Sequence, residues 1–170
     1  IAANIGDKAS LRRLVRESEA AFGSTDILVC NAASNPYYGG MTEISDEQFE
    51  KILRNNLMSS HWLATMVVQG MTRKKRGSIM LISSIGGLRG SAVIGAYNIS
   101  KAADFQLARN LAVEYGADGI RVNCIAPGII RTDFAKALWE DQQNLARALS
   151  GTPLGRIGEP DDIAGAAVFL

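Results

Sequence analysis

Three short apolar runs, separated by longer helical patterns, constrain the fold of this chain more than any other feature. The runs are DILVC, GSIMLIS and IRVNCI, at 26–30, 77–83 and 120–125. Short and largely uninterrupted apolar runs are typical of strands that are buried on both faces of a sheet. Strands that alternate with helices in this way predict an α/β fold with a parallel sheet.

Helical patterns precede and follow each run. The pattern at 7–22 places five residues on one face: Leu11, Leu14, Val15, Ser18 and Phe22. A capping box of Ser45 and Gln48 begins a second helix, which we expect to continue to about Arg73. Further helices are predicted at 96–115, 133–149 and 161–170. Right-handed crossovers then give a doubly wound, three-layer α/β/α sheet of the Rossmann type, expected as a single domain over 1–170.

The charge of the chain is nearly balanced, with 18 Lys and Arg, 17 Asp and Glu, and a net charge of +1. We therefore expect neither nucleic acid nor an anionic membrane as a partner. No apolar run reaches the length of about 18 residues that a membrane-spanning helix needs. Cys30 and Cys124 lie in apolar runs, which is typical of buried thiols in a reducing compartment, and a cytoplasmic location is expected. No cluster has metal-ligand spacing, and the pair Asp161-Asp162 suits a helix N-terminus instead.

The two ends of the sequence predict that it is an internal piece of a longer chain. It begins Ile-Ala-Ala-Asn, without Met and without a signal-peptide pattern. It ends within an apolar helical pattern that has no cap or stop.

A tyrosine and a lysine stand one helical turn apart in the pattern at 96–115. Tyr97 and Lys101 are four residues apart, so on a helix they share one face. A phenol has an ordinary pKa of about 10, and a neighbouring ammonium lowers it by favouring the phenolate. Such a pair can move a proton to or from a carbonyl or alcohol oxygen, which the nearby Ser84 hydroxyl can hydrogen-bond. For the pair taken alone, an exposed Tyr and Lys without a function is the alternative.

The motifs around this pair resemble those of the short-chain dehydrogenase/reductase family. SSIGG followed by YNISK is similar to the family's serine, tyrosine and lysine motif, with Tyr97 placed 13 residues after Ser84. DILVCNAA is similar to its Asn-Asn-Ala-Gly strand and loop, and RVNCIAPGIIRT to its Pro-Gly motif. Asn56, in ILRNNLMSS, falls where the family has a catalytic asparagine. The segments NAASNPYYGG and LGRIGEPDDIAGAAVFL are most similar to bacterial ketoacyl reductase-like and carbonyl reductase-like members.

This resemblance implies an oxidoreductase that transfers hydride between a nicotinamide cofactor, NADP or NAD, and a carbonyl or secondary alcohol. It implies Tyr97 as general acid/base, and Lys101 as the residue that lowers its pKa and binds the nicotinamide ribose. It implies that Ser84 orients the substrate oxygen and that Asn56 holds a water linked to Lys101. The implied cofactor-binding residues are Tyr97, Lys101, Asn4, Ile5, Asn31, Ala32, Ala33, Pro127, Gly128, Ile130 and Thr132.

The chain departs from the family pattern at several points. Asn4-Ile5 stands where the family has an Asp-Val pair near the adenine. Cys30 and Ala33 replace the first Asn and the Gly of Asn-Asn-Ala-Gly. The Gly-rich phosphate turn, near which NAD is distinguished from NADP, is expected before Ile1, and the last strand after Leu170.

Two other functions stay open at this point. One is a non-catalytic member or fragment of the same fold that binds a nucleotide or a partner. The other is a sugar-nucleotide epimerase or dehydratase, which shares the Tyr-x-x-x-Lys pair, although the SSIGG and PGIIRT motifs argue against it.

The resemblance also implies partners. Members of the family often form homodimers or homotetramers through the two long helices that contain Asn56 and Tyr97, so a homo-oligomer is expected. The segments that flank the substrate mouth in the family carry Tyr37, Tyr38 and Trp139, which favours an apolar or aromatic carbonyl substrate. Ordinary packing of these rings is the alternative.

Overall fold

A parallel three-stranded sheet is the base of the first of two compact units. The computed structural model describes residues 1–170, which divide into Ile1–Ala126 and Pro127–Leu170. The strands lie in the order β1-β2-β3. Their bounds are β1 (Ile27–Cys30), β2 (Gly77–Ile82) and β3 (Ile120–Ile125). All three strands occur where the apolar runs predict them, and both pairings are parallel, as predicted.

The register aligns the carboxyl ends of the three strands. Cys30 lies opposite Leu81, and Leu81 lies opposite Cys124. Asn31 directly follows β1, and Ser84 comes two residues after the end of β2. Polar residues that follow parallel strands meet at one edge of the sheet, which is where α/β folds bind ligands.

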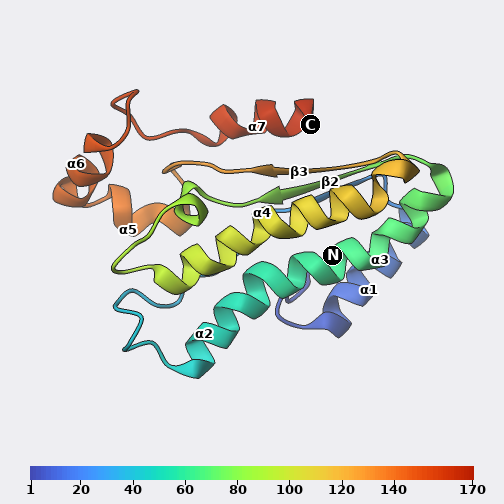
Figure 1. The fold of residues 1–170 in the computed structure, drawn as a ribbon, viewed down its shortest axis with the longest axis horizontal. Helices are drawn as coiled ribbons and strands as arrows, with labels where there is room; N and C mark the ends of the chain where they lie inside the picture. The colour runs from blue at the N-terminus through green and yellow to red at the C-terminus, as the bar shows by residue number, and fades with distance from the viewer. The chain divides into compact units, whose positions relative to one another are not determined.

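Four helices complete the first unit. They are α1 (Lys8–Phe22), α2 (Asp46–Leu53), α3 (Ser59–Lys74) and α4 (Gly95–Tyr115). Helix α3 packs on β1 and β2, α4 packs on β2 and β3, and α1 packs on α3 (Figure 1). No helix in either unit combines the length and the apolarity that are needed to cross a membrane.

The core of the first unit lies between the sheet and helices α3 and α4. One continuous cluster joins the two helices to the same face of the sheet: Cys30, Ala64, Val67, Val68, Met71, Ile79, Leu81, Ala108, Leu111 and Ile120. Side chains alternate between the faces of a strand, so Ile79 and Leu81 point to one side and share it with Cys30. The helices that follow β1 and β2 therefore cover the same face.

Two predictions about burial are wrong. The β1 strand was expected to be buried on both faces, yet Ile27 is 65% exposed and Val29 is 48% exposed. Helix α3 covers only the face with Leu28 and Cys30, and β1 is an edge strand that pairs only with β2. Phe22, expected on the buried face of α1, is 92% exposed because it is the last residue of that helix.

The predicted long helix that begins at Ser45 is present but changes its winding in the middle. The capping box forms as predicted: the Ser45 hydroxyl accepts from the Gln48 backbone, and the Gln48 side chain accepts from the Ser45 backbone. Between α2 and α3 the chain passes through a π-helical turn, Arg54–Met58. The run RNNLM contains poor helix formers, and π turns of this kind occur frequently at functional sites.

The second unit consists of short helices that are joined by irregular segments. A 3-10 turn (Asp133–Ala135) leads into α5 (Lys136–Trp139), which is followed by α6 (Gln142–Ser150) and α7 (Pro160–Phe169). The helix predicted at 133–149 is therefore split, because Asp141 leaves the helical conformation and caps α6 through the Asn144 backbone. The helix predicted at 161–170 is confirmed within one residue.

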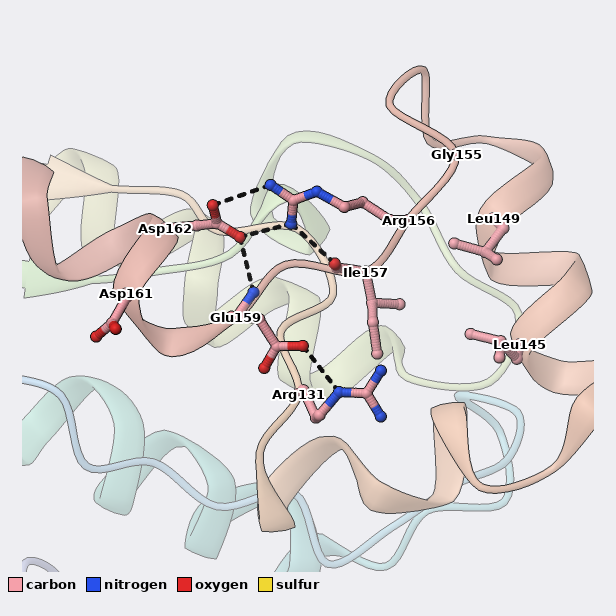
Figure 2. Close-up of a pocket in the computed structure, with 9 residues that line it drawn as sticks. All are labelled: Arg131, Leu145, Leu149, Gly155, Arg156, Ile157, Glu159, Asp161 and Asp162. Atoms are coloured by element: carbon pink, nitrogen blue, oxygen red, sulfur yellow. Dashed lines mark hydrogen bonds and ion pairs between the residues drawn. The ribbon is translucent and has the colours of Figure 1, made fainter.

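The N-terminus of α7 is organised by one carboxylate. Asp162 accepts two hydrogen bonds from the Arg156 guanidinium, at 2.7 and 3.0 Å, and one from the Glu159 backbone at 2.8 Å (Figure 2). These donors hold the pKa of the Asp162 carboxyl at about 2, below its ordinary value of 3.8. The acidic pair thus belongs to a helix N-terminus, as the sequence predicts.

A pH-dependent contribution to stability follows from Asp162. Its folded-state pKa is depressed, so its contribution is present above pH 4 and is lost as the pH falls towards about 2. We therefore expect Asp162→Asn to lower the thermal midpoint at pH 7, and the difference from wild type to shrink between pH 4 and pH 2. Thermal denaturation followed by circular dichroism measures this.

Asp161→Asn is the matched control, because it removes the same charge one residue earlier, where no ion pair forms. An equal loss of stability in both variants, unchanged with pH, would show that the hydrogen bonds to Arg156 and Glu159 contribute nothing.

Candidate functional site

Helix α4 carries the central residues of the candidate site. Tyr97 and Lys101 lie one turn apart near its start, with the Lys101 Nζ 5.9 Å from the centre of the Tyr97 ring. Lys101 is only 3% exposed. Its ammonium donates to the Ile82 carbonyl at 2.8 Å and forms an ion pair with the Asp104 Oδ2 at 3.2 Å. The two residues are thus neighbours on one face of α4, as the spacing predicts.

Ser84 reaches this face through a turn that packs closely on α4. It caps a short 3-10 turn, Ile85–Leu88, and its hydroxyl accepts from the Gly86 N–H at 3.0 Å. A Cβ on Gly87 would lie 2.7 Å from the Lys101 carbonyl carbon, and a Cβ on Gly86 would lie 2.5 Å from the Asn98 Oδ1. Only glycines permit this approach, which brings the Ser84 side chain into hydrogen-bonding contact with Tyr97.

The electrostatics of the site differ from the expectation for Tyr97. Burial raises the pKa of its phenol, while the hydrogen bond with Ser84 acts in the opposite direction. The negative charge of Asp104 and the nearby Tyr38 also raise it. Lys101 was expected to lower this pKa, and the net direction is nevertheless a rise, because burial of the phenol is the largest contribution.

Asn56 is a buried bridge between three segments. It lies in the π-helical turn and is 1% exposed. Its Oδ1 accepts from the Ser34 N–H at 2.8 Å, and its Nδ2 donates to the Ser34 carbonyl and to the Ser100 hydroxyl, both at 3.0 Å. The amide therefore ties the loop after β1 and helix α4 to the turn. The role implied for Asn56, holding a water, stays a prediction.

The loop after β1 is held at a second point. The Gly39 N–H donates to the Val93 carbonyl at 2.9 Å, and Gly39 pairs with Ile94 in an isolated parallel bridge. Tyr37 turns back on its own loop, with its hydroxyl donating to the Gly40 carbonyl at 3.0 Å. Tyr38, the next residue in this loop, is exposed.

The predicted cofactor-binding residues of the first unit lie in two segments. Asn31 and Ala32 are exposed and Ala33 is half-buried, immediately beyond the carboxyl end of β1. Asn4 is exposed, and its Oδ1 accepts from the Gly6 N–H at 2.9 Å, so part of its side chain shapes the turn before α1. Ile5 is half-buried in the same turn.

The predicted cofactor-binding residues of the second unit precede α5. Ile130 pairs with Gly158 in a parallel bridge, and the Thr132 hydroxyl caps the 3-10 turn by accepting from Ala135 at 3.3 Å. Pro127 and Gly128 begin this unit and lie within four residues of the end of β3.

The second unit also contains an open pocket of about 630 Å³, shown in Figure 2. Four of its five charged side chains form ion pairs, Arg131 with Glu159 and Arg156 with Asp162, and Asp161 is the fifth. Leu145 contributes apolar surface from α6. None of the predicted catalytic residues lines this pocket.

Three residues of the site were missed by the sequence analysis. Ser34 and Ser100 receive the hydrogen bonds of Asn56, and Asp104 pairs with Lys101. A serine gives little signal in a sequence. Asp104 gives a clearer one, because it lies three residues after Lys101 and seven after Tyr97, on the stripe of α4 that faces the core.

The bridging role of Asn56 predicts a specific loss of stability. Asn56→Ala removes one buried and two partly buried hydrogen bonds and leaves both backbone groups of Ser34 without these partners. We expect it to reduce the free energy of unfolding by about 2 kcal/mol in urea denaturation.

Asn55→Ala is the matched control in the same turn. Asn55 makes one side-chain bond, to the Ser34 hydroxyl, and is half-buried, so water can replace it. We expect a cost of about 1 kcal/mol or less. Equal costs for the two variants would contradict the bridging role.

Comparisons with known proteins identify the family. The family model described as enoyl-(acyl carrier protein) reductase matches residues 1–170. Dehydrogenase/reductase SDR family member 4 of Oryctolagus cuniculus is 38% identical over 167 residues, which are 98% of this chain and 64% of that protein. The human dehydrogenase/reductase SDR family member 2, mitochondrial, is 36% identical over 170 residues, 100% of this chain and 60% of that protein. The chain thus spans less than two thirds of the length of these relatives.

Solved structures agree with the sequence comparisons. The structure of gox2181 has a TM-score of 0.95 and 31% identity, and the match covers 100% of this chain and 67% of that one. A gluconate 5-dehydrogenase from Burkholderia cenocepacia J2315, in complex with NADP and tartrate, has a TM-score of 0.92 and 29% identity, with 98% and 65% covered. The α/β fold with a parallel sheet is therefore of the Rossmann type, and the chain belongs to the short-chain dehydrogenase/reductase family.

Proposed function

We propose that the protein is an NAD(P)-dependent oxidoreductase that transfers hydride between a nicotinamide and a carbonyl or secondary alcohol. The observation that carries the proposal is the contact of Ser84 with Tyr97 beside a buried Lys101, at the carboxyl edge of the sheet. A hydroxyl donor and a phenol that converge on one point suit a carbonyl oxygen. The relatives named above as dehydrogenases or reductases support the same activity.

The residues of the first unit fit a nicotinamide cofactor. An ammonium has three N–H donors. Lys101 uses two of them, on Ile82 and Asp104, so one is left for a ribose hydroxyl. Asn31 and Ala32 are exposed at the end of β1, where a nucleotide can lie against small side chains. We propose that these residues, with Tyr97, hold either NADP or NAD. A cofactor-binding role for Pro127, Gly128, Ile130 and Thr132 stays a prediction.

The cofactor, when bound, supplies or accepts the hydride. Tyr97 supplies the proton: its phenol donates to the carbonyl oxygen during reduction and accepts from the alcohol during oxidation. Ser84 donates a second hydrogen bond to the same oxygen and holds the reacting carbon in place. Lys101 orients the ribose side of the site. Asn56 holds the loop after β1 against α4, so that the site keeps its shape.

The raised pKa of Tyr97 suits the direction of reduction. Burial favours the neutral phenol, which is the form that donates a proton at neutral pH. Oxidation needs the phenolate, and we therefore expect it to require a higher pH than reduction.

The surroundings of Tyr97 favour an apolar carbonyl substrate. Several exposed apolar side chains belong to the segments around the site: Tyr38, Met41, Leu88 and Val93. The Gly39–Val93 hydrogen bond holds the loop that carries Tyr38 beside the segment that carries Val93. Met41 packs beside Gly95 at the start of α4. A polyhydroxy acid would find few polar partners on these side chains, whereas an aromatic or aliphatic ketone would bury apolar surface.

We also propose that the protein forms a homodimer or homotetramer through helices α3 and α4. Exposed apolar side chains on this helical layer support an association surface: Met58, Ile99 and Val113. A groove lined by Thr65, Val68 and Tyr115 lies between the two helices.

Replacement of Tyr97 tests the proposed function. Tyr97→Phe removes the acidic proton but keeps the ring, so we expect turnover of simple ketones with NADPH or NADH to fall about a thousandfold. Binding of the reduced cofactor, followed by nicotinamide fluorescence, should change little.

Tyr115→Phe is the control, because Tyr115 is the last residue of the same helix. We expect it to keep full activity. Unchanged turnover in Tyr97→Phe would refute the mechanism. Absence of turnover in the wild-type protein, with either cofactor, would favour a non-catalytic nucleotide- or partner-binding member of the family.

A further inference from the structure

An asparagine near the start of α4, Asn98, is buried next to the candidate catalytic tyrosine and has no part in the function proposed above. It is 7% exposed and directly follows Tyr97. Burial of an amide is costly unless its polar atoms are hydrogen-bonded. The contacts of Asn98 therefore indicate which part of the structure this amide serves.

The side-chain amide of Asn98 contacts both ends of the turn Ile85–Leu88. Its Nδ2 donates to the carbonyl of Arg89, the residue that directly follows the turn, at 3.0 Å. Its Oδ1 faces Gly86, where an added Cβ would lie 2.5 Å away. The amide therefore spans the turn and holds it against α4.

The two polar atoms of the amide are not equally satisfied. The Asn98 Oδ1 is buried and has no hydrogen-bond partner. An unpaired buried acceptor is destabilising, and an apolar side chain of similar size would not carry one. The amide is therefore explained by its Nδ2, since no apolar side chain could donate to the Arg89 carbonyl.

The turn connects Asn98 to Ser84 over a short distance. The Gly86 N–H donates to the Ser84 Oγ and the Gly87 N–H donates to the Ser84 carbonyl, both at 3.0 Å. A Cβ on Gly86 would lie 3.3 Å from the Ser84 Oγ, so Gly86 separates the Ser84 hydroxyl from the Asn98 amide. A displacement of the turn relative to α4 would therefore also move the Ser84 hydroxyl.

We propose that Asn98 is a positioning residue that fixes the turn Ile85–Leu88 on α4 and so sets the place of the Ser84 hydroxyl relative to Tyr97. This inference rests on the proposed function, because that function assigns Ser84 to the substrate oxygen. Asn98 acts only through Ser84. A residue that merely stabilised α4 would instead affect turnover whether or not the Ser84 hydroxyl is present.

Asn98→Ala tests the proposal, because it removes both contacts of the amide with the turn. Loss of an oxyanion donor costs about a hundredfold or more in kcat, and a displaced donor loses part of that effect. We therefore expect kcat for reduction of a simple ketone to fall about tenfold, while the KM for the reduced cofactor stays the same. An unchanged kcat would overturn the proposal.

The decisive measurement repeats this substitution in a protein that lacks the Ser84 hydroxyl. Ser84→Ala should lower kcat by itself. Asn98→Ala added to it should lower kcat no further, because no hydroxyl is left to position. A further loss of about tenfold in the double variant would show that Asn98 acts independently of Ser84, and the proposal would be rejected.

Asn110→Ala is the matched control, because it removes the same side chain from the exposed side of α4. Asn110 accepts one hydrogen bond from the Gln106 Nε2 at 2.8 Å and lies about three turns further along the helix. We expect full activity. A loss equal to that in Asn98→Ala would assign the effect to a weakened helix and overturn the proposal.

A second variant covers the case in which Asn98→Ala does not fold. Asn98→Ser keeps a polar side chain, but one that is too short to replace the bond to the Arg89 carbonyl. We expect the same loss of kcat and the same dependence on the Ser84 hydroxyl. Full activity in Asn98→Ser would contradict the positioning role.

Hydrogen exchange of the Gly86 and Gly87 amides, followed by NMR, distinguishes failure of this inference from failure of the proposed function. Both amides should exchange faster in Asn98→Ala, because the turn has lost its contacts with α4. Faster exchange in a protein that shows no turnover would reject the oxidoreductase activity and support the anchoring of the turn by Asn98. Unchanged exchange would reject the role of Asn98, whatever the turnover.

Discussion

The candidate site depends on the close approach of the turn Ile85–Leu88 to helix α4. Gly86 and Gly87 stand where a Cβ would collide with Asn98 and with the backbone of Lys101. This contact brings Ser84, which follows β2, to Tyr97 on α4. If the turn lay further from the helix, both side chains would still be present but would not share a substrate oxygen.

The π-helical turn extends the same constraint to the loop after β1. The extra residue in this turn rotates Asn56 inward, where its amide satisfies both backbone groups of Ser34 and the hydroxyl of Ser100. The Asn56 side chain therefore links the loop after β1 to helix α4. The local cost of poor helix formers in mid-helix is offset by hydrogen bonds between segments that are far apart in the sequence.

The sequence was sufficient for most of the fold, since the runs that predict β1, β2 and β3 and the capping box at Ser45 follow local rules. It was insufficient where the burial or the pKa of a residue depends on residues that are distant in the sequence. The exposure of Ile27 and Val29 depends on which helices cover each face of the sheet, and periodicity does not report that. At the site, the spacing of Tyr97 and Lys101 predicted their contact on α4. The pKa of Tyr97 could not be predicted, because it depends on burial and on Asp104.

The inner stripe of α4 shows how a packing surface and a polar site share one helix. Ala108 and Leu111 continue the stripe that begins with Tyr97, Lys101 and Asp104, and they join the core. The apolar half holds the helix on β2 and β3, so the polar half has little freedom to move. A buried lysine in such a place needs a counter-charge, and only Asp104 provides one. The same face of α4 thus carries both the residues that pack the helix on the sheet and the buried ion pair beside the site.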